Sequence, residues 1–369
     1  MDKVINLIMT LVLKGSITSM KGDAMKKIAI EEHIHTEDYI AYLYTRKEYP
    51  RRDLIEKGGK KFIRDWWSPT NYRLMDPNKP DKLTDQGEGR IKEMDEVGIE
   101  MQVLSLSFPG VELFDAADGT SIAKRVNDNL SEVINRYPKR FASLAAIAPQ
   151  DPLSAADELE RAVTKLGLKG AIINGNIRGE FLDDKKFWPI LETAQKLDVP
   201  IYIHPKMPPA DMIKPYLAYP GLASAMAGFA AEASLHAMRL ICSGVFDQYP
   251  DLKIILGHLG EALPFWLWRL DSRLQEEKGD PASAEFYKYL KKNPSQYFKD
   301  NFYVTTSGMF WSPVLEFVCS VLGAEKVLFA IDYPYESSKA AVDFMDTSSI
   351  SDTDKEKICH LNAERLLKL

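Results

Sequence analysis

The sequence predicts an α/β fold of the (β/α)8 TIM-barrel type, and three observations indicate it. Eight short apolar segments alternate with segments of helical pattern along the 369 residues, as they do where a parallel sheet is built. Eight repeats favour a closed barrel over an open sheet. No GxGxxG motif follows an early strand, which argues against a dinucleotide-binding open sheet.

The expected strands are short and rich in apolar residues: 27–30, 101–104, 141–147, 170–173, 199–203, 252–256, 302–305 and 327–331. The expected helices lie between them, at about 90–97, from 117 or 121 to 136, 154–166, 186–197, 223–242, from 261 into the 270s, and 313–321, with further helices at the C-terminal end. The first of these helices is expected to end at Gly98, because glycine is favoured directly after a helix.

We expect one barrel domain over residues 25–369, preceded by an N-terminal extension, 1–24, outside the fold. The apolar run at 4–13 could also be the core of a signal peptide, but Asn6 and Thr10 dilute it and no good cleavage site follows. Residues 36–88 are expected to be an insertion at the barrel mouth after the first strand. Long connections of this kind usually carry function, and its aromatic and basic residues suit an aromatic anion and a docking patch equally well.

Composition excludes several classes of protein. The net charge of −6 is mild and no basic stripe is present, so we expect no nucleic-acid partner. No apolar run is long enough to span a bilayer, so we expect no membrane partner. Cys242, Cys319 and Cys359 are widely spaced without a CxxC motif, which favours reduced thiols in a cytoplasmic protein.

Reactive side chains gather where the expected strands end. Glu31 and His33 are two apart at the end of the first strand, so they point to the same side. His204 ends the fifth strand, His258 follows the sixth and Asp332 follows the eighth. Barrel active sites lie at these strand ends, and two imidazoles with carboxylates suit Zn²⁺ or Mn²⁺. The sequence therefore predicts a divalent-metal site.

The partner of His33 in this site is open from the residues alone. His35 also lies two residues from His33. If the strand shifts by two residues, His33 and His35 form the ligand pair and Glu31 is a bystander.

Longer motifs around these residues narrow the family. They are AIEEH at 29–33, YIHP at 202–205, ILGHLGE at 255–261, LP at 263–264, WR at 268–269, TTSG at 305–308 and IDYP at 331–334. Together they resemble the metal-dependent aromatic-acid decarboxylases of the amidohydrolase superfamily. That group includes the 2,3-dihydroxybenzoate, γ-resorcylate and 5-carboxyvanillate decarboxylases and is related to aminocarboxymuconate semialdehyde decarboxylase. The resemblance runs from about residue 25 to residue 369.

The resemblance implies a ligand set of Glu31, His33, His204 and Asp332, with His35 as the alternative ligand. Two-metal members of the superfamily usually carry a modified lysine at the end of the fourth strand. That strand ends here at Asn174, so the resemblance implies a single metal ion.

The activity implied is the non-oxidative decarboxylation of a hydroxylated aromatic acid, with release of CO₂. Asp332 would deliver a proton to the ring carbon, and His258 with Glu261 would orient or ionise the phenol. The implied substrate-binding residues are Arg269, Asn174 and Tyr335.

The implied partner is a small aromatic carboxylic acid. A second copy of the chain is also expected, as a homodimer or homotetramer. The FWLW run at 265–268 has too many aromatic residues to bury on one side of one helix, so part of it is expected to face another subunit.

The competing hypothesis is a metal-dependent hydrolase or hydratase acting on a small carboxylic acid or lactone. The His33-x-His35 spacing supports this alternative. Asn174 and the pattern of His258–Glu261 with Trp268-Arg269 oppose it.

Overall fold

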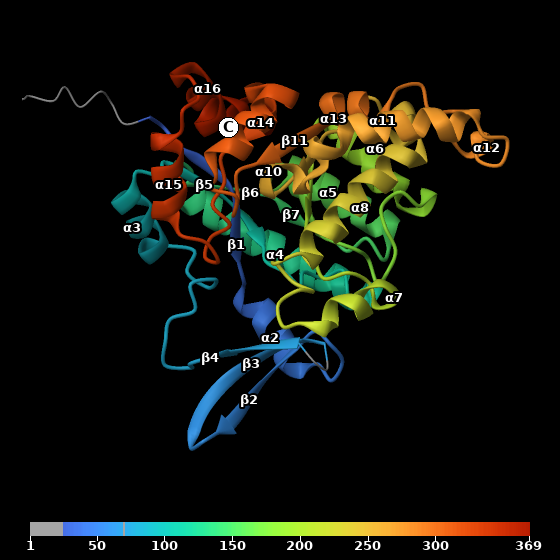
Figure 1. Ribbon diagram of the computed structural model, residues 1–369. Coiled ribbons are helices and arrows are strands. Elements are labelled where there is room, and N and C mark those ends of the chain that lie inside the picture. The colour runs from blue at the N-terminus through green and yellow to red at the C-terminus, as the bar shows by residue number, and fades with distance from the viewer. Residues whose placement is uncertain (1–24, 69–70) are drawn as a thin grey trace, which may run out of the picture.

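The computed structural model describes residues 25–68 and 71–369, and its barrel strands confirm the predicted fold class (Figure 1). The strands are β1 (Ile28–Ile34), β5 (Met101–Leu106), β6 (Phe141–Ser143), β7 (Ala145–Ala146), β8 (Ala171–Asn174), β9 (Ile201–His204), β10 (Ile254–Leu256), β11 (Phe302–Thr305) and β12 (Val327–Leu328). The third predicted strand is interrupted at Leu144, which divides it into β6 and β7. The predicted extension, 1–24, lies outside the described residues.

All pairings between the barrel strands are parallel, and their order follows the chain. The sheet β1-β5-β6 continues into β7-β8-β9-β10-β11-β12 where the Leu144 amide donates to Leu104 O. The ring closes between β12 and β1. There Ile30 N donates to Phe329 O at 3.2 Å, and a parallel bridge joins Glu32 to Tyr333.

A register irregularity divides β1 between Ala29 and Glu32. Ile28, before it, and Ile30, within it, belong to an inner apolar cluster that includes Tyr202 of β9. Glu31, also within it, contacts the hydroxyl of the same Tyr202. The irregularity therefore turns the adjacent residues Ile30 and Glu31 to the same side of the sheet, as β-bulges at barrel rims do.

The helices pack around the barrel through a larger apolar cluster that includes buried residues of almost every strand. They are α3 (Glu88–Val97), α4 (Ala116–Arg136), α5 (Pro152–Thr164), α6 (Trp188–Leu197), α7 (Ala210–Ile213), α8 (Gly228–Ser243), α9 (Val245–Gln248), α10 (His258–Glu261), α11 (Leu263–Gly279), α12 (Ala284–Tyr287), α13 (Pro294–Asn301), α14 (Ser312–Leu322), α15 (Ser338–Thr347), α16 (Asp352–Glu356) and α17 (Asn362–Leu367). Four short helices of other types complete the chain: η1 (Lys185–Phe187), η2 (Lys214–Ala218), η3 (Ala324–Lys326) and η4 (Lys357–Leu361). Within the described ranges, no helix has both the length and the apolar character of a membrane span.

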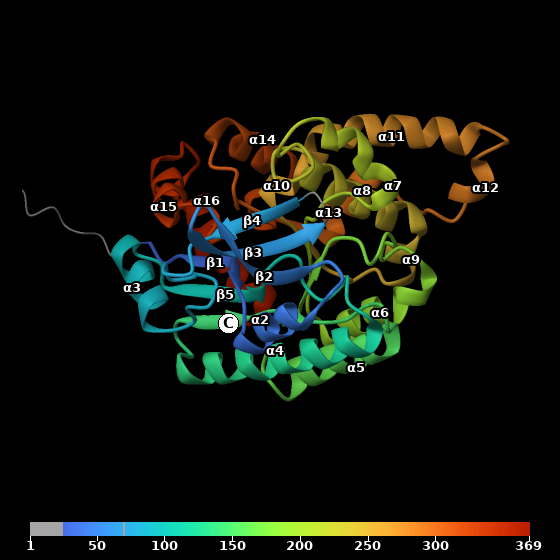
Figure 2. The ribbon, with the colours of Figure 1, turned by 90° about the horizontal axis from the view of Figure 1, so that it is seen from below.

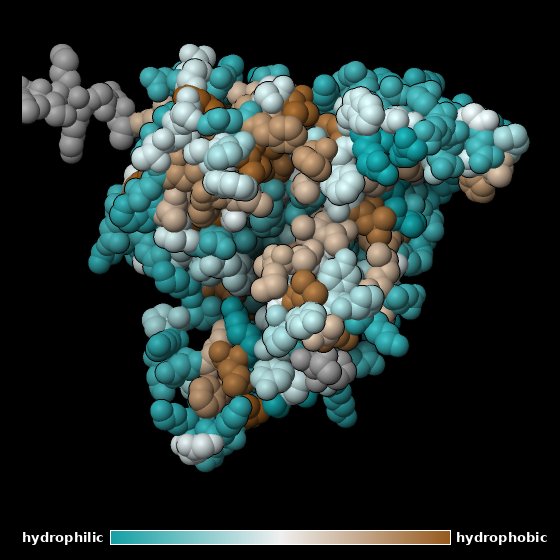
Figure 3. Space-filling model, in the orientation of Figure 1, coloured by the Kyte–Doolittle hydropathy of each residue, from teal (hydrophilic) through white to brown (hydrophobic). Residues whose placement is uncertain are grey.

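The segment after β1 builds an arm from α2 (Glu37–Thr45), β2 (Arg51–Lys57), β3 (Lys60–Ser68) and β4 (Asn71–Met75). Its strands are antiparallel, and the buried side chains of Arg52 and Asp65 join β2 to β3 through two hydrogen bonds. β1 runs toward this arm (Figure 1), and a view from below shows β2–β4 lying across that end of the molecule (Figure 2). The arm carries hydrophobic residues among hydrophilic ones (Figure 3).

Candidate metal centre and active site

Three parts of the barrel bring four potential metal ligands together. Glu31 and His33 come from β1, His204 ends β9, and Asp332 follows β12. One ligand atom from each residue can be chosen so that all four lie within 4.8 Å of one another. Within residues 25–68 and 71–369, this is the one group of three or more such residues with this geometry.

Polar atoms in this group converge without hydrogen bonds. His33 Nε2 lies 3.1 Å from Asp332 Oδ1, and His204 Nε2 lies 3.6 Å from Glu31 Oε1. Glu31 Oε1, both ring nitrogens of His33 and Asp332 Oδ1 are buried without a hydrogen-bond partner among the described residues. Buried polar atoms are normally paired. Two imidazoles and two carboxylates left in this state fit a divalent cation such as Zn²⁺ or Mn²⁺.

Burial and nearby charges prepare these groups differently. Burial, reinforced by the charge of His33, holds the pKa of His204 well below its usual value, so His204 is neutral and can donate a lone pair. Burial also raises the pKa of Glu31, although the charge of His258 opposes this shift. The second Glu31 oxygen, Oε2, accepts hydrogen bonds from Tyr202 and, at 3.1 Å, from Thr305. These bonds leave Oε1 as the free oxygen.

A histidine–glutamate pair stands beside Asp332. His258 Nδ1 lies 2.7 Å from Glu261 Oε1, and His258 Nε2 lies 3.7 Å from Asp332 Oδ2. Both residues of the pair have positive φ in the short helix α10, which folds Glu261 back under the imidazole. Burial lowers the pKa of His258, but Glu261 and Asp332 outweigh it and raise this pKa well above its usual value. The imidazole is therefore protonated at neutral pH.

Asp332, beside His258, carries a negative charge. Burial raises its pKa, but the neighbouring His258 and His33 imidazoles outweigh burial and hold the pKa far below its usual value. Asp332 is therefore ionised in the free protein. The protonated His258 and the ionised Asp332 form an ion pair that can hold one proton between them.

Two of the predicted substrate-binding residues lie near this centre. The ring of Tyr335 lies 5.6 Å from the ring of His33, and its hydroxyl is 2.8 Å from Ser107 Oγ. Asn174 pairs in register with His204, and its side-chain Oδ1 is buried without a hydrogen-bond partner among the described residues. Both positions suit contact with a molecule bound at the metal group.

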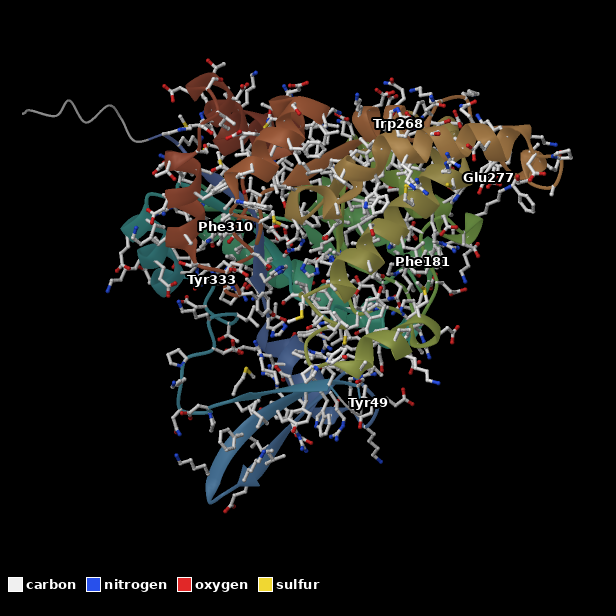
Figure 4. All side chains as sticks on the ribbon, viewed as in Figure 1. Tyr49, Phe181, Trp268, Glu277, Phe310 and Tyr333 are labelled. Atoms are coloured by element: carbon white, nitrogen blue, oxygen red, sulfur yellow. The ribbon has the colours of Figure 1, made fainter. Side chains whose placement is uncertain are left out.

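Arg269, the third predicted substrate-binding residue, is exposed on α11. Its neighbour Trp268 is 80% exposed, and Figure 4 shows Trp268 well separated from Tyr333, the residue that follows Asp332. Substrate binding by Arg269 therefore stays a prediction from the family resemblance.

His35 lies outside the metal group. It is buried against Tyr39, with ring centroids 5.1 Å apart. Burial, reinforced by the charge of Arg52, lowers its pKa to about 3. The hydrolase alternative relied on His33 and His35 as a ligand pair, and the structure places Glu31 rather than His35 with His33.

Residues of the arm line a cavity beside the centre that motif analysis did not identify. Trp67, Arg73 and Phe108 line it together with His35 and Tyr335. Arg73 donates to Asp65 at 3.3 Å, and its Nε is buried without a partner among the described residues. The only signal in the sequence was the density of arginine and aromatic residues in 36–88, which does not single out one residue.

A second buried polar cluster, also missed, comprises Glu112, Lys206 and Glu232 and is called here the lysine cluster. Glu112 accepts a hydrogen bond from Asn174 N at 2.6 Å, and Glu232 accepts one from Asn176 N at 2.6 Å. Lys206 donates to Asn176 O, and its charge acts on both carboxylates. This cluster therefore fixes the chain that follows β8.

A family model described as Amidohydrolase matches residues 33–369. The chain belongs to the amidohydrolase family. The γ-resorcylate decarboxylase of Polaromonas sp. strain JS666 is 38% identical over 351 residues, which cover 93% of this chain and 98% of that protein.

Solved structures of decarboxylases share the fold. The 5-carboxyvanillate decarboxylase of Sphingomonas paucimobilis has a TM-score of 0.82 at 35% identity, covering 94% of this chain and 100% of that one. The dihydroxybenzoic acid decarboxylase of Polaromonas sp. JS666, with bound manganese and the inhibitor 2-nitroresorcinol, has a TM-score of 0.78 at 36% identity. It covers 93% of this chain and 97% of that one. The predicted resemblance to this group is confirmed.

Proposed function

We propose that this amidohydrolase is a carboxy-lyase that removes CO₂ from a hydroxylated aromatic acid with one divalent metal ion. The observation that carries the proposal is the group of Glu31, His33, His204 and Asp332, whose potential ligand atoms lie within 4.8 Å of one another and include buried atoms without hydrogen-bond partners. Manganese in the Polaromonas structure supports Mn²⁺ as the ion, and the ligand set also suits Zn²⁺.

Glu31, His33, His204 and Asp332 would hold the ion. When bound, it supplies a Lewis acid and a template for the substrate carboxylate and an ortho hydroxyl. Asp332 is ionised before substrate arrives, so it must first gain a proton. The substrate hydroxyl can supply this proton as it ionises, so that His258, 3.7 Å from Asp332, stays an imidazolium. Asp332 then delivers it to the ring carbon as the carboxylate leaves.

His258 has a different use in this scheme. As an imidazolium held by Glu261, it stabilises a phenolate oxygen by charge rather than removing the phenol proton. Glu261 fixes the orientation of the His258 imidazole and maintains its positive charge. The sequence predicted that this pair orients or ionises the phenol. The role proposed here is narrower: the pair stabilises the ionised phenol.

Aromatic side chains line the narrow cavity beside the centre. We place the substrate ring near Tyr335, Trp67 and Phe108, with Asn174 Oδ1 accepting from a substrate hydroxyl. The guanidinium of Arg73 gives the same cavity a positive charge suited to an anionic substituent.

We also propose that a second copy of the chain covers the outer face of α11. Phe265 and Trp268 are 74% and 80% exposed there, and Trp266 is half exposed. Arg269 lies on the same helix, so its predicted contact with substrate would be made with the partner's site. Sedimentation should show a dimer or tetramer that Trp268→Glu dissociates, and a wild-type monomer would contradict the proposal.

The decisive assay gives the Mn²⁺-loaded protein a panel of hydroxybenzoates that includes γ-resorcylate, 2,3-dihydroxybenzoate and 5-carboxyvanillate. We expect CO₂ and the matching phenol in equal amounts from at least one acid. Esters and lactones serve as the comparison set. Their cleavage, without CO₂ from any aromatic acid, would replace the proposal by the hydrolase alternative.

A further inference from the structure

Glu32 stands between two metal-ligand candidates, Glu31 and His33, and is fully buried. Its Oε1 accepts a hydrogen bond at 3.0 Å from the amide of Ile331, the residue directly before Asp332. Its Oε2 accepts one at 3.2 Å from Gln102 Nε2 on β5. The Glu32 carboxylate therefore ties β1 to the chain that carries Asp332 and to the strand on the other side.

Arg90 of α3 reaches the same place and is also fully buried. Its Nη2 donates to the carbonyl oxygen of His33 at 2.7 Å, and its Nη1 donates to Gln102 Oε1 at 3.4 Å. Its guanidinium carbon lies 4.5 Å from the ring centroid of Tyr333, the residue directly after Asp332. Arg90 therefore contacts the segment that carries His33 and the segment that carries Asp332. It does so through the His33 carbonyl oxygen and the Tyr333 ring, neither of which is a metal-ligand candidate.

These contacts matter because the join between β1 and β12 is held by few backbone bonds. His33 N donates to Tyr333 O at 2.8 Å, and Asp332 N donates to Glu31 O at 3.1 Å. β12 itself ends at Leu328, so Asp332 is not part of a regular strand. Its φ of 76° is one that residues with a side chain rarely adopt, so the surroundings must hold it there.

Burying a carboxylate costs desolvation free energy, whereas an apolar side chain would fill the same space without that cost. Both oxygens of Glu32 accept hydrogen bonds, and one of these comes from the backbone amide of Ile331, next to Asp332. An apolar residue of similar size could not accept that bond.

We propose that Glu32 and Arg90 are positioning residues that hold His33 and Asp332 at the separation required to bind one divalent cation. Gln102 links the two and completes the support. Neither residue touches the ion or the substrate. The inference rests on the proposed metal site and adds residues that act through its ligands.

The test compares Glu32→Ala with Glu158→Ala by titrating the metal-free proteins with Mn²⁺ alone. Glu158 is a matched control, because it is also a buried carboxylate with both oxygens bonded, to Asn127 and Arg161, and it lies on α5. We expect Glu32→Ala to weaken Mn²⁺ binding about 10- to 100-fold and to change the electron paramagnetic resonance spectrum of bound Mn²⁺. Glu158→Ala should leave both unchanged.

Glu32→Gln keeps an oxygen for the Ile331 amide, so it should recover most of the lost affinity. If Glu32→Ala does not fold, Gln102→Leu tests the same support, and we expect it to weaken Mn²⁺ binding by a smaller factor. Wild-type affinity in the folded Glu32 or Gln102 variants, or an equal loss in Glu158→Ala, would overturn the inference.

The proposed function can fail separately. If the wild type binds Mn²⁺ but releases CO₂ from no aromatic acid, the decarboxylase proposal is wrong. In that case a selective loss of Mn²⁺ affinity in Glu32→Ala still supports the positioning role. A wild type that does not bind Mn²⁺ overturns this inference.

Discussion

The metal group and the lysine cluster are both buried near the ends of barrel strands, yet their polar atoms have different partners. In the metal group, Glu31 Oε1, Asp332 Oδ1 and the ring nitrogens of His33 have no hydrogen-bond partner among the described residues. In the lysine cluster, Glu112 and Glu232 each accept a backbone amide through one oxygen, and their second oxygens also lack a hydrogen-bond partner among the described residues.

The second difference is the source of positive charge. The lysine cluster supplies its own cation, Lys206, whose charge acts on both carboxylates. The metal group has two carboxylates and two imidazoles, and its unpaired atoms suit a cation from outside the chain. Substitutions in the metal group should therefore affect metal binding and turnover most, whereas substitutions in the lysine cluster should affect stability.

The largest effect is expected at Asp332. Asp332→Asn keeps the shape of the side chain but removes the negative charge and the group that delivers the proton. Turnover should fall at least about 10²- to 10⁴-fold, the usual contribution of a general acid. The measurement is kcat at saturating Mn²⁺ and substrate. Retained kcat would remove Asp332 from the proton delivery.

The next effect separates Glu31 from His35. Glu31→Ala removes a ligand, so Mn²⁺ affinity should fall more than about 100-fold, beyond the loss usual for residues that only support ligands. His35→Ala should change it only a few-fold, because His35 lies outside the group. Metal content by mass spectrometry and Mn²⁺ titration measure both. The reverse order would make His35 the ligand that accompanies His33.

The metal group could be predicted because its members occupy positions that the pattern of apolar strands identifies. Glu31, His33, His204 and Asp332 lie at or just after apolar strands, and parallel strands bring such ends to one edge. The same logic placed all eight strands and could not choose between Glu31 and His35, which share the spacing from His33. The structure decides the grouping through the register irregularity in β1, which sequence spacing does not reveal.

No local sequence pattern identifies the other contacts. Arg90 and Lys206 look like ordinary basic residues in the sequence, and only packing shows that both are buried. Arg73 reaches the cavity because β4 folds back along β3. Arg269 is a different case, since a motif predicted substrate contact and the side chain is exposed on α11, so the prediction depends on a second copy of the chain. Long-range packing decides these cases, and local patterns do not encode it.

The smallest effect we predict concerns the lysine cluster and appears as a pH dependence of stability. Burial raises the pKa of Glu232 to about 7, although the nearby charge of Lys206 opposes this shift. The ordinary value is 4.5. The folded protein therefore holds the Glu232 proton more tightly than the unfolded chain does. Stability from this group is fully present below pH 4.5 and is lost as the pH rises through about 7.

Glu232→Gln removes this titration and keeps an oxygen for the Asn176 amide. Relative to wild type, its free energy of unfolding should rise by about 3 kcal/mol between pH 4.5 and 7, and then stay level. Urea unfolding of the metal-free proteins at several pH values measures the difference. Lys206→Met should move the upper limit of this window to higher pH, because it removes the charge that lowers the pKa of Glu232. A difference independent of pH would mean that Glu232 stays ionised beside Lys206, and the lysine cluster would then be a permanent ion pair.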